Sequence, residues 1–479
     1  EAKNVDMIII GSFIYLRFGQ SIHLSDDQLS FLKTLNRVNK PTTLVSFGNP
    51  YILSDLPETD AHVLGWYNSS YQINGVVPAL FGASEVKATL PIEIPGLYPL
   101  GAGLGMNHTT LRFGTPEEVD LDHNELFKID EIVNDAIRDS VFPGAIVGIV
   151  KDGVLAYNRG YGYQDYSKTQ DVQPTDVYDV ASITKVMATT AATMKLIDDE
   201  KLSLDSKVSE FFTEFDTKDK KNITVRDILL HQTGLPPFRV YVDSIRTRKE
   251  IVNAIKNEPL TYETGSKYVY SDLGMILLAE IIHEITGQPL DRYTRNEFYF
   301  PMNMYSTFFN PASNSRWLVS RISPTEIDTV FDRGLVRARV HDERAYFMDG
   351  VAGHAGLFSS SIDMAKFSTM LLNGGVYSGR RYLKQETIQK FTTMQSKHSG
   401  RGLGFDRKSP SGFTTAGQLA SNDTFGHLGF TGTSLWIDRE KNMAVILLTN
   451  RTYPNRAYGK RISEIRAKVA DAAYSAITN

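Results

Sequence analysis

The sequence contains no cysteine, which excludes disulfides, thiolate metal ligands and a cysteine nucleophile. It also lacks any apolar run near the ~18 residues that a membrane-spanning helix needs. The longest candidates, such as residues 274–282, predict core segments. Charge of neither sign dominates, because the formal net charge is -4 at pH 7, so neither nucleic acid nor an anionic membrane is an expected partner. What remains is an ordinary globular composition in a chain of 479 residues, enough for two or three domains.

The first hundred residues alternate between strand and helix patterns. Buried-strand patterns occur at 6–13, 42–47 and 61–66; a helical pattern at 26–38 separates the first two, and another at 70–81 follows the third. Ser25 is the expected cap of the first of these helices. Strand–helix–strand order predicts a parallel βαβ unit, so this part of the chain has α/β character.

Four segments within this region together resemble one known domain. The stretches 44–53 (Leu-Val-Ser-Phe-Gly-Asn-Pro-Tyr-Ile-Leu), 80–82, 90–95 and 96–101 resemble the C-terminal α/β domain of glycoside hydrolase family 3, with β-N-acetylglucosaminidases nearest. In that family the catalytic residues lie on a preceding barrel of ~250 residues, which this region is too short to contain. No glycosidase residue is therefore carried over. We expect residues 1–105 to be a partial domain, the tail of a larger fusion.

A second domain is expected after a linker. Residues 106–121 carry no periodicity and are predicted to be the linker, and residues 122–479 the second domain. That domain opens with an amphipathic helix (121–141) and a hairpin turned at Lys151-Asp152-Gly153. Two more strands are predicted near the C-terminus, at 434–437 and 443–449. The pattern predicts an α+β domain: an antiparallel sheet built from both ends of the domain and flanked by helices, plus an all-helical region.

The segment 178–190 contains Ser182 and Lys185, three residues apart at the start of a predicted helix. Residues at i and i+3 share a helix face, so the Lys amine can reach the Ser hydroxyl. The first turn of a helix also favours a developing anion. A serine hydroxyl needs a neighbouring base, and a lysine with a lowered pKa can serve. Alone, such a pair is more often a helix-capping serine followed by a solvated lysine.

The second domain resembles the serine β-lactamase and penicillin-binding-protein superfamily, nearest its class C and esterase branch. Three motifs stand in the expected order: Ser182-Ile-Thr-Lys185, Tyr270-Ser-Asp272 and His427-Leu-Gly429. The stretch 229–236 also resembles a Leu-Leu-x-His-Thr-Ser-Gly-Leu-Pro segment of this group.

The resemblance implies an acyl-enzyme on Ser182, with Lys185 and Tyr270 sharing the proton transfers. It places the oxyanion between the backbone N–H groups of Ser182 and Phe430, the residue after Gly429. His427, titratable near neutral pH, is expected to bond the acyl intermediate or the Tyr270 oxygen.

Two positions depart from the superfamily pattern. His427 stands where many β-lactamases have a lysine, which puts the cation for a β-lactam carboxylate in doubt. Asp272 stands where an asparagine amide is usual, and a carboxylate accepts hydrogen bonds but cannot donate them. Asp272 is left open between a site role and a structural role. The departures favour an esterase or a peptidase over an efficient β-lactamase.

The segment His341-Asp342-Glu343 and His354 are candidate metal ligands, but neither has the spacing of a helix-based zinc site. A structural or pocket-lining role is the expectation for 341–359, and neither a metal nor a cofactor is expected.

The hypothesis is therefore a serine hydrolase acting on an ester or amide of a small or peptide-like substrate, in a setting of cell-wall turnover. Two alternatives stay open: a catalytically silent module that binds cell-wall peptides, and a β-N-acetylglucosaminidase whose barrel is missing from this sequence. The chain begins at Glu1 without a signal peptide, which predicts a processed or truncated product. The absence of cysteine suits a bacterial periplasmic or secreted location. The sequence leaves the natural substrate and the oligomeric state open.

Overall fold

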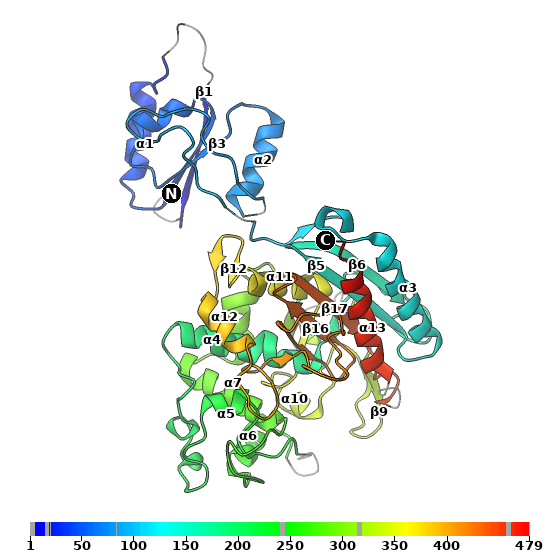
Figure 1. The fold of residues 1–479 in the computed structure, drawn as a ribbon. Helices are drawn as coiled ribbons and strands as arrows, with labels where there is room; N and C mark the ends of the chain where they lie inside the picture. Colours follow the sequence, from blue (N-terminus) through cyan, green and yellow to red (C-terminus); the bar gives the residue numbers. More distant parts are fainter. Residues whose placement is uncertain are drawn as a thin grey trace. The chain divides into compact units, whose positions relative to one another are not determined.

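The computed structural model describes residues 5–14, 19, 21–82, 84–106, 108–239, 245–313, 319–456 and 461–478. The chain divides into two compact units, Glu1–Thr110 and Leu111–Asn479 (Figure 1). In the described part of the chain, no helix is both long and apolar enough to cross a membrane.

The first unit is a parallel three-stranded sheet with helices. Its strands are β1 (Ile8–Ile14), β2 (Thr42–Gly48) and β3 (Ala61–Leu64), in that order, and its helices are α1 (Asp26–Asn36), a 3-10 helix (Pro50–Asp55) and α2 (Ser70–Leu80). The predicted βαβ order is confirmed, because β1 pairs with β2 in parallel from Ile8 opposite Thr42. Ser25 caps α1 through a capping box with Gln28, as its position predicted.

The second unit is built on a seven-stranded sheet that joins the two ends of the unit. The strand order is β14-β15-β16-β17-β5-β6-β4, antiparallel except that β4 and β6 are parallel. The strands are β4 (Arg112–Phe113), β5 (Gly144–Lys151), β6 (Val154–Gly162), β14 (Asp406–Arg407), β15 (Thr424–Leu428), β16 (Ser434–Asp438) and β17 (Met443–Thr449). The hairpin β5–β6 and the late strands β16 and β17 lie where the sequence predicted them.

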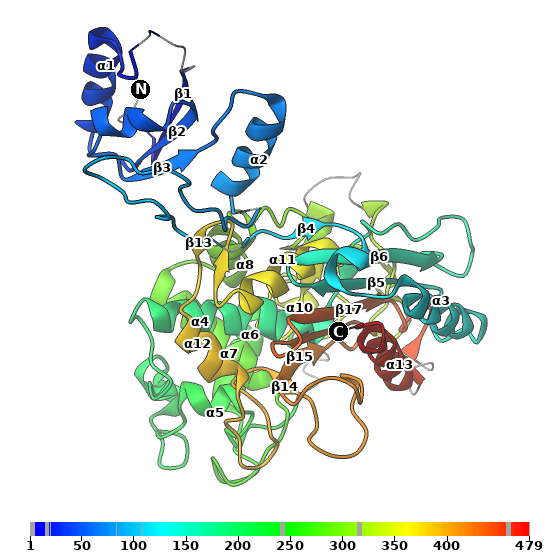
Figure 2. The same ribbon diagram turned by 45° about the horizontal axis from the view of Figure 1, so that its top comes forward.

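Both faces of this sheet are covered by apolar clusters, and the side chains of the central strands alternate between the two clusters. On β17, Ile446 and Leu448 belong to one cluster, whereas Val445 and Leu447 belong to the other. The first cluster includes α11 (Ser361–Leu372), and the second includes α3 (His123–Arg138) and α13 (Ile462–Ser475), which lie side by side in both ribbon views (Figure 2). Each fully buried valine, leucine or isoleucine side chain stabilises the fold by about 1.5–3 kcal/mol, so this sheet is a stable support for the rest of the unit.

The segment expected as a linker ends earlier than predicted. Residues Leu111–Leu121 belong to the second unit, where β4 pairs with β6 and a 3-10 helix (Pro116–Val119) follows. Glu118 accepts a hydrogen bond from Arg112 Nη1 at 2.8 Å and one from the backbone N–H of Thr115. A two-residue strand has no periodicity to detect, so sequence patterns do not predict it.

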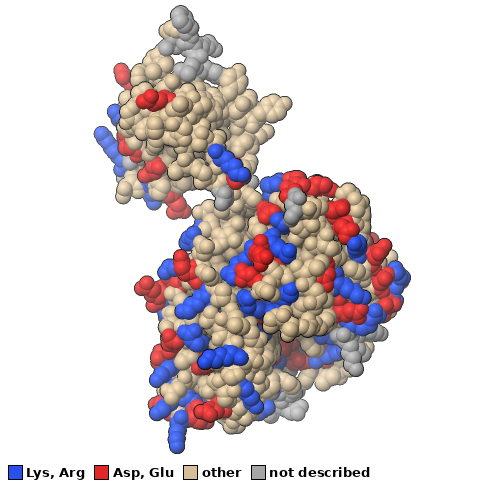
Figure 3. All heavy atoms as spheres, in the orientation of Figure 1, with Lys and Arg blue, Asp and Glu red and all other residues tan. Residues whose placement is uncertain are grey.

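The remaining elements form the helical region and three small sheets. The helices are α4 (Ala191–Asp198), α5 (Val225–Leu229), α6 (Arg248–Asn257), α7 (Asp272–Thr286), α8 (Leu290–Thr294), α10 (Glu343–Phe347) and α12 (Gln385–Thr392). Short 3-10 helices span Ala181–Ile183, Val208–Glu210, Thr213–Phe215 and Pro311–Ser313, and π-helices span Lys185–Thr190 and Arg295–Tyr299. The small sheets pair β7 (Tyr178–Asp179), β11 (Leu357–Ser359) and β8 (Phe308–Phe309); β9 (Glu326–Asp328) and β10 (Gly334–Val336); and β12 (Val376–Tyr377) and β13 (Arg380–Arg381). On the face shown in Figure 3, basic and acidic side chains are interspersed over this unit.

Candidate active site

Ser182 lies in a tight turn between β7 and a π-helix. The predicted regular helix is wrong in detail: Ser182 belongs to the 3-10 helix Ala181–Ile183, and a π-helix begins at Lys185. Ala181 has a φ of 48°, a left-handed conformation that is costly for a residue with a Cβ. The Asp179 carboxylate accepts the Ala181 N–H at 2.8 Å and stabilises the turn. This turn leaves Ser182 on the wall of a cavity.

Lys185 is fully buried and points at Ser182. Its Nζ lies 2.9 Å from Ser182 Oγ and donates to the His354 carbonyl at 3.1 Å. It also lies 2.9 Å from Asp272 Oδ1. Burial lowers the pKa of Lys185, but the negative charge of Asp272 and the contact with Tyr270 outweigh burial and raise it. The sequence argument invoked a lysine with a lowered pKa; the structure instead holds an ammonium, because Asp272 supplies the counter-charge.

Tyr270 lies among two cations and two histidines. Lys185 Nζ is 4.9 Å from the centre of its ring, and the Arg401 guanidinium carbon is 5.8 Å away on the same measure. The ring centres of His231 and His427 lie 4.6 and 6.1 Å from that of Tyr270.

Both of these histidines are neutral. Burial, followed by the charges of Arg401 and Lys185, holds the pKa of His231 and of His427 well below the usual range. The expectation that His427 titrates near neutral pH is therefore wrong, because its side chain is buried and two cations lie close to it. His427 Nδ1 lies 2.8 Å from the Leu428 carbonyl, which can only accept, so Nδ1 carries the proton and Nε2 is an acceptor.

Asp272, the first residue of α7, is held between two cations. Beyond Lys185, its other carboxylate oxygen lies 2.7 Å from Arg344 Nη2. Arg344 also reaches Asp342 Oδ2 at 3.1 Å, and Asp342 Oδ1 lies 2.8 Å from His354 Nε2. Burial raises the pKa of Asp272, but Lys185, then His354 and Arg344, outweigh it, so the pKa lies well below its usual range.

Asp272, Asp342 and His354 offer ligand atoms within 4.8 Å of one another, the geometry of a small metal site. The two carboxylates already contact Lys185 and Arg344, however, so side-chain cations hold the place that a metal ion would take. We assign no metal to this group.

Gly429 and Phe430 lie in a loop whose backbone carbonyls accept hydrogen bonds from the buried Arg466. A Cβ on Gly429 would lie 2.0 Å from Thr433 Oγ1 and 2.5 Å from the Val180 carbonyl, so only glycine fits. Arg466 of α13 donates to the carbonyls of Gly429 and Thr433 at 2.7 and 2.8 Å, and to that of Gly432 at 3.3 Å. The Phe430 side chain lines the cavity.

The cavity has a volume of about 770 Å³. Ser182, Tyr270, Asp272, His354 and Phe430 all line it, so the structure brings five of the predicted site and pocket residues to one place. Its far wall is the β9–β10 hairpin, of which residues 326–331 line the cavity. His341, Asp342 and Glu343 line it too, which confirms the pocket-lining role expected for the 341–359 stretch.

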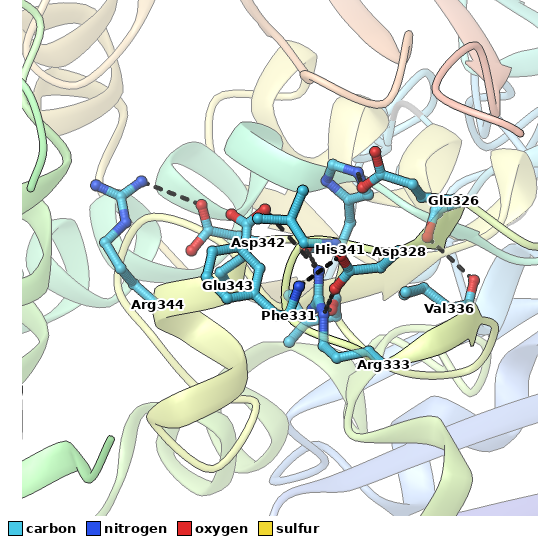
Figure 4. A network of polar contacts seen from close by, with 12 residues as sticks. Glu326, Asp328, Phe331, Arg333, Val336, His341, Asp342, Glu343 and Arg344 are labelled. Atoms are coloured by element: carbon cyan, nitrogen blue, oxygen red, sulfur yellow. Dashed lines mark hydrogen bonds and ion pairs between the residues drawn. The ribbon is translucent and has the colours of Figure 1, made fainter. Parts of the chain in front are cut away.

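The hairpin wall is fixed by ion pairs (Figure 4). Arg333 contacts the Asp328 carboxylate and donates to the His341 carbonyl at 2.9 Å. Glu326 Oε2 lies 2.9 Å from His341 Nε2 and 2.8 Å from Arg456 Nη2.

Sequence reasoning missed Arg344, Arg401 and Arg466. A signal existed for the first, because a carboxylate at position 272 requires a cation nearby when it is buried. Arg466 follows Ile462 by four residues on the buried face of α13, an unusual place for an arginine. Arg401 lies outside helices and strands, and no pattern marked it.

Comparison with known proteins identifies the family. The family model described as Beta-lactamase matches residues 129–470. The Escherichia coli (strain K12) protein named "Putative D-alanyl-D-alanine carboxypeptidase" is 32% identical over 378 residues, which cover 72% of this chain and 87% of that protein. The Bacillus subtilis (strain 168) protein named "N-acetylmuramyl-L-alanine amidase" is 34% identical over 380 residues, covering 73% and 84%.

Solved structures agree on the fold. A penicillin-binding protein homologue from Caulobacter crescentus has a TM-score of 0.61 at 18% identity, covering 74% of this chain and 98% of that one. A family VIII carboxylesterase has a TM-score of 0.56 at 19% identity, covering 74% and 97%. These likenesses establish the mixed sheet-and-helix fold, and the sequence relatives carry the activity class. The chain belongs to the beta-lactamase family, and it is a serine hydrolase of that family.

Proposed function

We propose that this protein is an amidase that hydrolyses the bond between the lactyl group of an N-acetylmuramyl sugar and the L-alanine of its peptide. The observation that carries the proposal is the Ser182–Lys185 pair beside the cavity, where the charges are already neutralised. Among the described residues, each cation that lines the cavity has an acidic partner: Arg239 pairs with Glu258, Arg344 with Asp272 and Asp342, and Arg456 with Glu326 and Glu343.

In the reaction that we infer, Tyr270 acts as a phenolate: Ser182 Oγ attacks the lactyl carbonyl and gives its proton to the Tyr270 oxygen. Lys185 stays an ammonium, donates to Ser182 Oγ and stabilises the charge on the Tyr270 oxygen. The backbone N–H groups of Ser182 and Phe430 hold the oxyanion. The C–N bond then breaks, the alanine nitrogen leaves with the proton from Tyr270, and an ester to Ser182 remains.

Water completes the cycle. Tyr270 takes a proton from the water that attacks the ester, and the muramyl carboxylate leaves as Ser182 regains its proton. His427 Nε2, an acceptor without a partner among the described residues, lies on the Tyr270 side of the site and suits a hydrogen-bond donor of the acyl intermediate.

The charge arrangement favours this amide over a C-terminal D-alanine. A D-alanyl-D-alanine carboxypeptidase expels an amino acid whose carboxylate lies next to the scissile nitrogen, so it needs a cation there. Here His427, in the third motif, is neutral, and Lys185 is paired with Asp272. The muramyl–alanine bond has no charged group beside it. Phe238, Phe331 and Phe430 line the cavity and offer apolar surface for a sugar ring.

The first test is intact mass after exposure to a fluorophosphonate, on the wild type and on Ser182→Ala. We expect a single label on the wild type and none on the variant. The second is a substrate panel: N-acetylmuramyl-L-alanyl-D-isoglutamine, diacetyl-L-lysyl-D-alanyl-D-alanine, p-nitrophenyl acetate and nitrocefin. Release of N-acetylmuramic acid at a kcat/KM at least tenfold above the other amides supports the proposal. A preference for D-alanine release would replace it with the carboxypeptidase activity for which the Escherichia coli relative is named.

We further propose a setting in cell-wall turnover, in the periplasm or outside the cell. The resemblance of residues 1–105 to the C-terminal domain of family 3 β-N-acetylglucosaminidases supports this setting, since β-N-acetylglucosaminidases release muramyl peptides from glycan. Fractionation of cells that express the full-length protein tests the location.

A further inference from the structure

Five groups form a closed ring of contacts behind Ser182. Lys185 Nζ contacts Asp272 Oδ1 at 2.9 Å, and Asp272 Oδ2 contacts Arg344 Nη2 at 2.7 Å. Arg344 Nη2 reaches Asp342 Oδ2 at 3.1 Å, and Asp342 Oδ1 contacts His354 Nε2 at 2.8 Å. The His354 carbonyl closes the ring by accepting from Lys185 Nζ at 3.1 Å. Side-chain exposure within the ring is 22% or less, so these charges interact with little screening.

We propose that Arg344 is a positioning residue of the reaction, which holds Asp272 and Asp342 in this ring and so keeps Lys185 charged and directed at Ser182. The inference rests on the proposed roles of Ser182, Lys185 and Tyr270. It goes beyond them, because Arg344 belongs to none of the three motifs and lies 72 residues after Asp272 in the chain.

The ring explains why an aspartate stands where an asparagine is usual. The two cationic side chains, Lys185 and Arg344, face the two carboxylates of Asp272 and Asp342, so these four charges balance. An amide at position 272 would leave Lys185 and Arg344 with the single carboxylate of Asp342. Burial would then favour loss of the proton from Lys185. Conversely, loss of Arg344 alone would leave one carboxylate in excess.

Electrostatics agree with the geometry at each ring member that departs from its ordinary value. Burial raises the pKa of Asp342, but His354 and Arg344 outweigh it and hold it well below the usual range. Burial lowers the pKa of Arg344, but Asp342 and Asp272 outweigh it and raise it. Each charge in the ring is thus stabilised by the next.

The segment 341–344 also joins the ring to the hairpin wall. Figure 4 shows Arg344 on one side of this segment and Glu326, Asp328 and Arg333 on the other. His341 and Glu343 contact the wall side, at Glu326 and Arg456, whereas Asp342 and Arg344 contact the ring. Successive side chains therefore alternate between the cavity wall and the ring.

The test is a charge-compensation cycle: Arg344→Met, Asp272→Asn, the double variant and the conservative Arg344→Lys. Arg248→Met is the matched control, because Arg248 also forms a part-buried ion pair, with Glu280 at 2.6 Å, but does not line the cavity. The readout is the second-order rate of fluorophosphonate labelling from pH 5 to 10, measured by intact mass, with circular dichroism melts to verify folding.

The signs follow from charge. The rate rises as the base loses its proton and falls as Lys185 loses its own. Arg344→Met removes a positive charge, so both limbs of the pH–rate profile move to higher pH, by about 1 pH unit or more. Asp272→Asn adds net positive charge, so both limbs move downward. The double variant restores the balance of charge, so its limbs lie between those of the two single variants. Arg344→Lys keeps the charge and leaves the limbs in place.

Five other titratable groups face Lys185, and none of them is substituted in these variants: Tyr270, His231, His427, His354 and Arg401. Unmoved limbs in a folded Arg344→Met, or a double variant whose shift is no smaller than those of the single variants, would overturn the ring proposal while labelled wild type keeps the hydrolase. If Arg344→Met does not fold, Arg344→Lys with displaced limbs overturns it equally. A folded wild type that takes no label removes the proposed function, and the ring proposal with it.

Discussion

Replacing Arg466 with methionine tests whether the loop after β15 acts through the backbone N–H of Phe430. The guanidinium is buried in α13 and has three carbonyl partners, those of Gly429, Gly432 and Thr433. It therefore fixes both ends of the loop that carries Phe430. Methionine fills a similar volume but donates no hydrogen bond, so the loop would lose these attachments.

The expected change in stability is small, because two large terms oppose each other. Three hydrogen bonds from a charged donor are worth about 5–9 kcal/mol together at 1.5–3 each. Against this, burial, with a smaller effect of Arg451, lowers the pKa of Arg466 from 12.5 to about 9. At 1.36 kcal/mol per pKa unit, that difference corresponds to about 5 kcal/mol for keeping the charge buried. The net loss of stability is then about 0–4 kcal/mol.

The expected change in activity is large. Loss of one oxyanion donor lowers kcat by about 10²–10³, and because the donor acts in the transition state, KM should change little. The assay is steady-state hydrolysis of p-nitrophenyl acetate and of the muramyl dipeptide, with thermal melts in parallel. Lys468→Met, which removes an exposed lysine from the same helix, is the control. Wild-type kcat in a folded Arg466→Met would refute the reasoning, and so would a rise in KM with kcat intact.

Three further predictions concern pH and metals. Burial raises the pKa of Glu326, but His341 and Arg456 outweigh it and lower it from 4.5 to about 2, so its contribution to stability is complete above pH 4.5 and is lost as pH falls through 2. Glu326→Gln should therefore unfold at a lower urea concentration than the wild type at pH 7, with a free energy of unfolding lower by up to about 3 kcal/mol. Its free energy of unfolding should also fall less steeply as the pH is lowered, and equal slopes for both proteins would contradict this. Because burial holds the pKa of His231 and of His427 well below the usual value of 6.5, neither histidine should produce a limb near that pH in kcat/KM, and His427→Gln should lower the rate without moving the limbs. Dialysis against EDTA should leave activity unchanged, because Lys185 and Arg344 already neutralise Asp272 and Asp342; inactivation reversed by zinc would show otherwise.

Much of the fold followed from local patterns. The strands of the first unit, the β5–β6 hairpin and strands β16 and β17 were predictable, because period-two alternation and turn residues are short-range signals. The turn at Ser182 was not, because its 3-10 and π geometry depends on Asp179 and on β11, which lies far along the chain. The strand β4 was missed for the same reason, because it pairs with β6, a strand remote from it in the sequence.

The sequence by itself determined the chemistry class and predicted the residues that carry it. Ser182, Lys185, Tyr270 and the third motif are recognisable in one dimension, since a nucleophile and its lysine must occupy fixed helical spacing. The absence of cysteine and of apolar spans also needs no structure.

Tertiary structure alone decided the charge state of those groups. Whether Lys185 is an amine or an ammonium depends on the carboxylate 2.9 Å away, and whether His427 is charged depends on burial and on Arg401. Arg344 enters the site from a segment remote from every motif. Coulomb energies and desolvation vary with distance and burial across the fold, and residue spacing along the chain encodes neither.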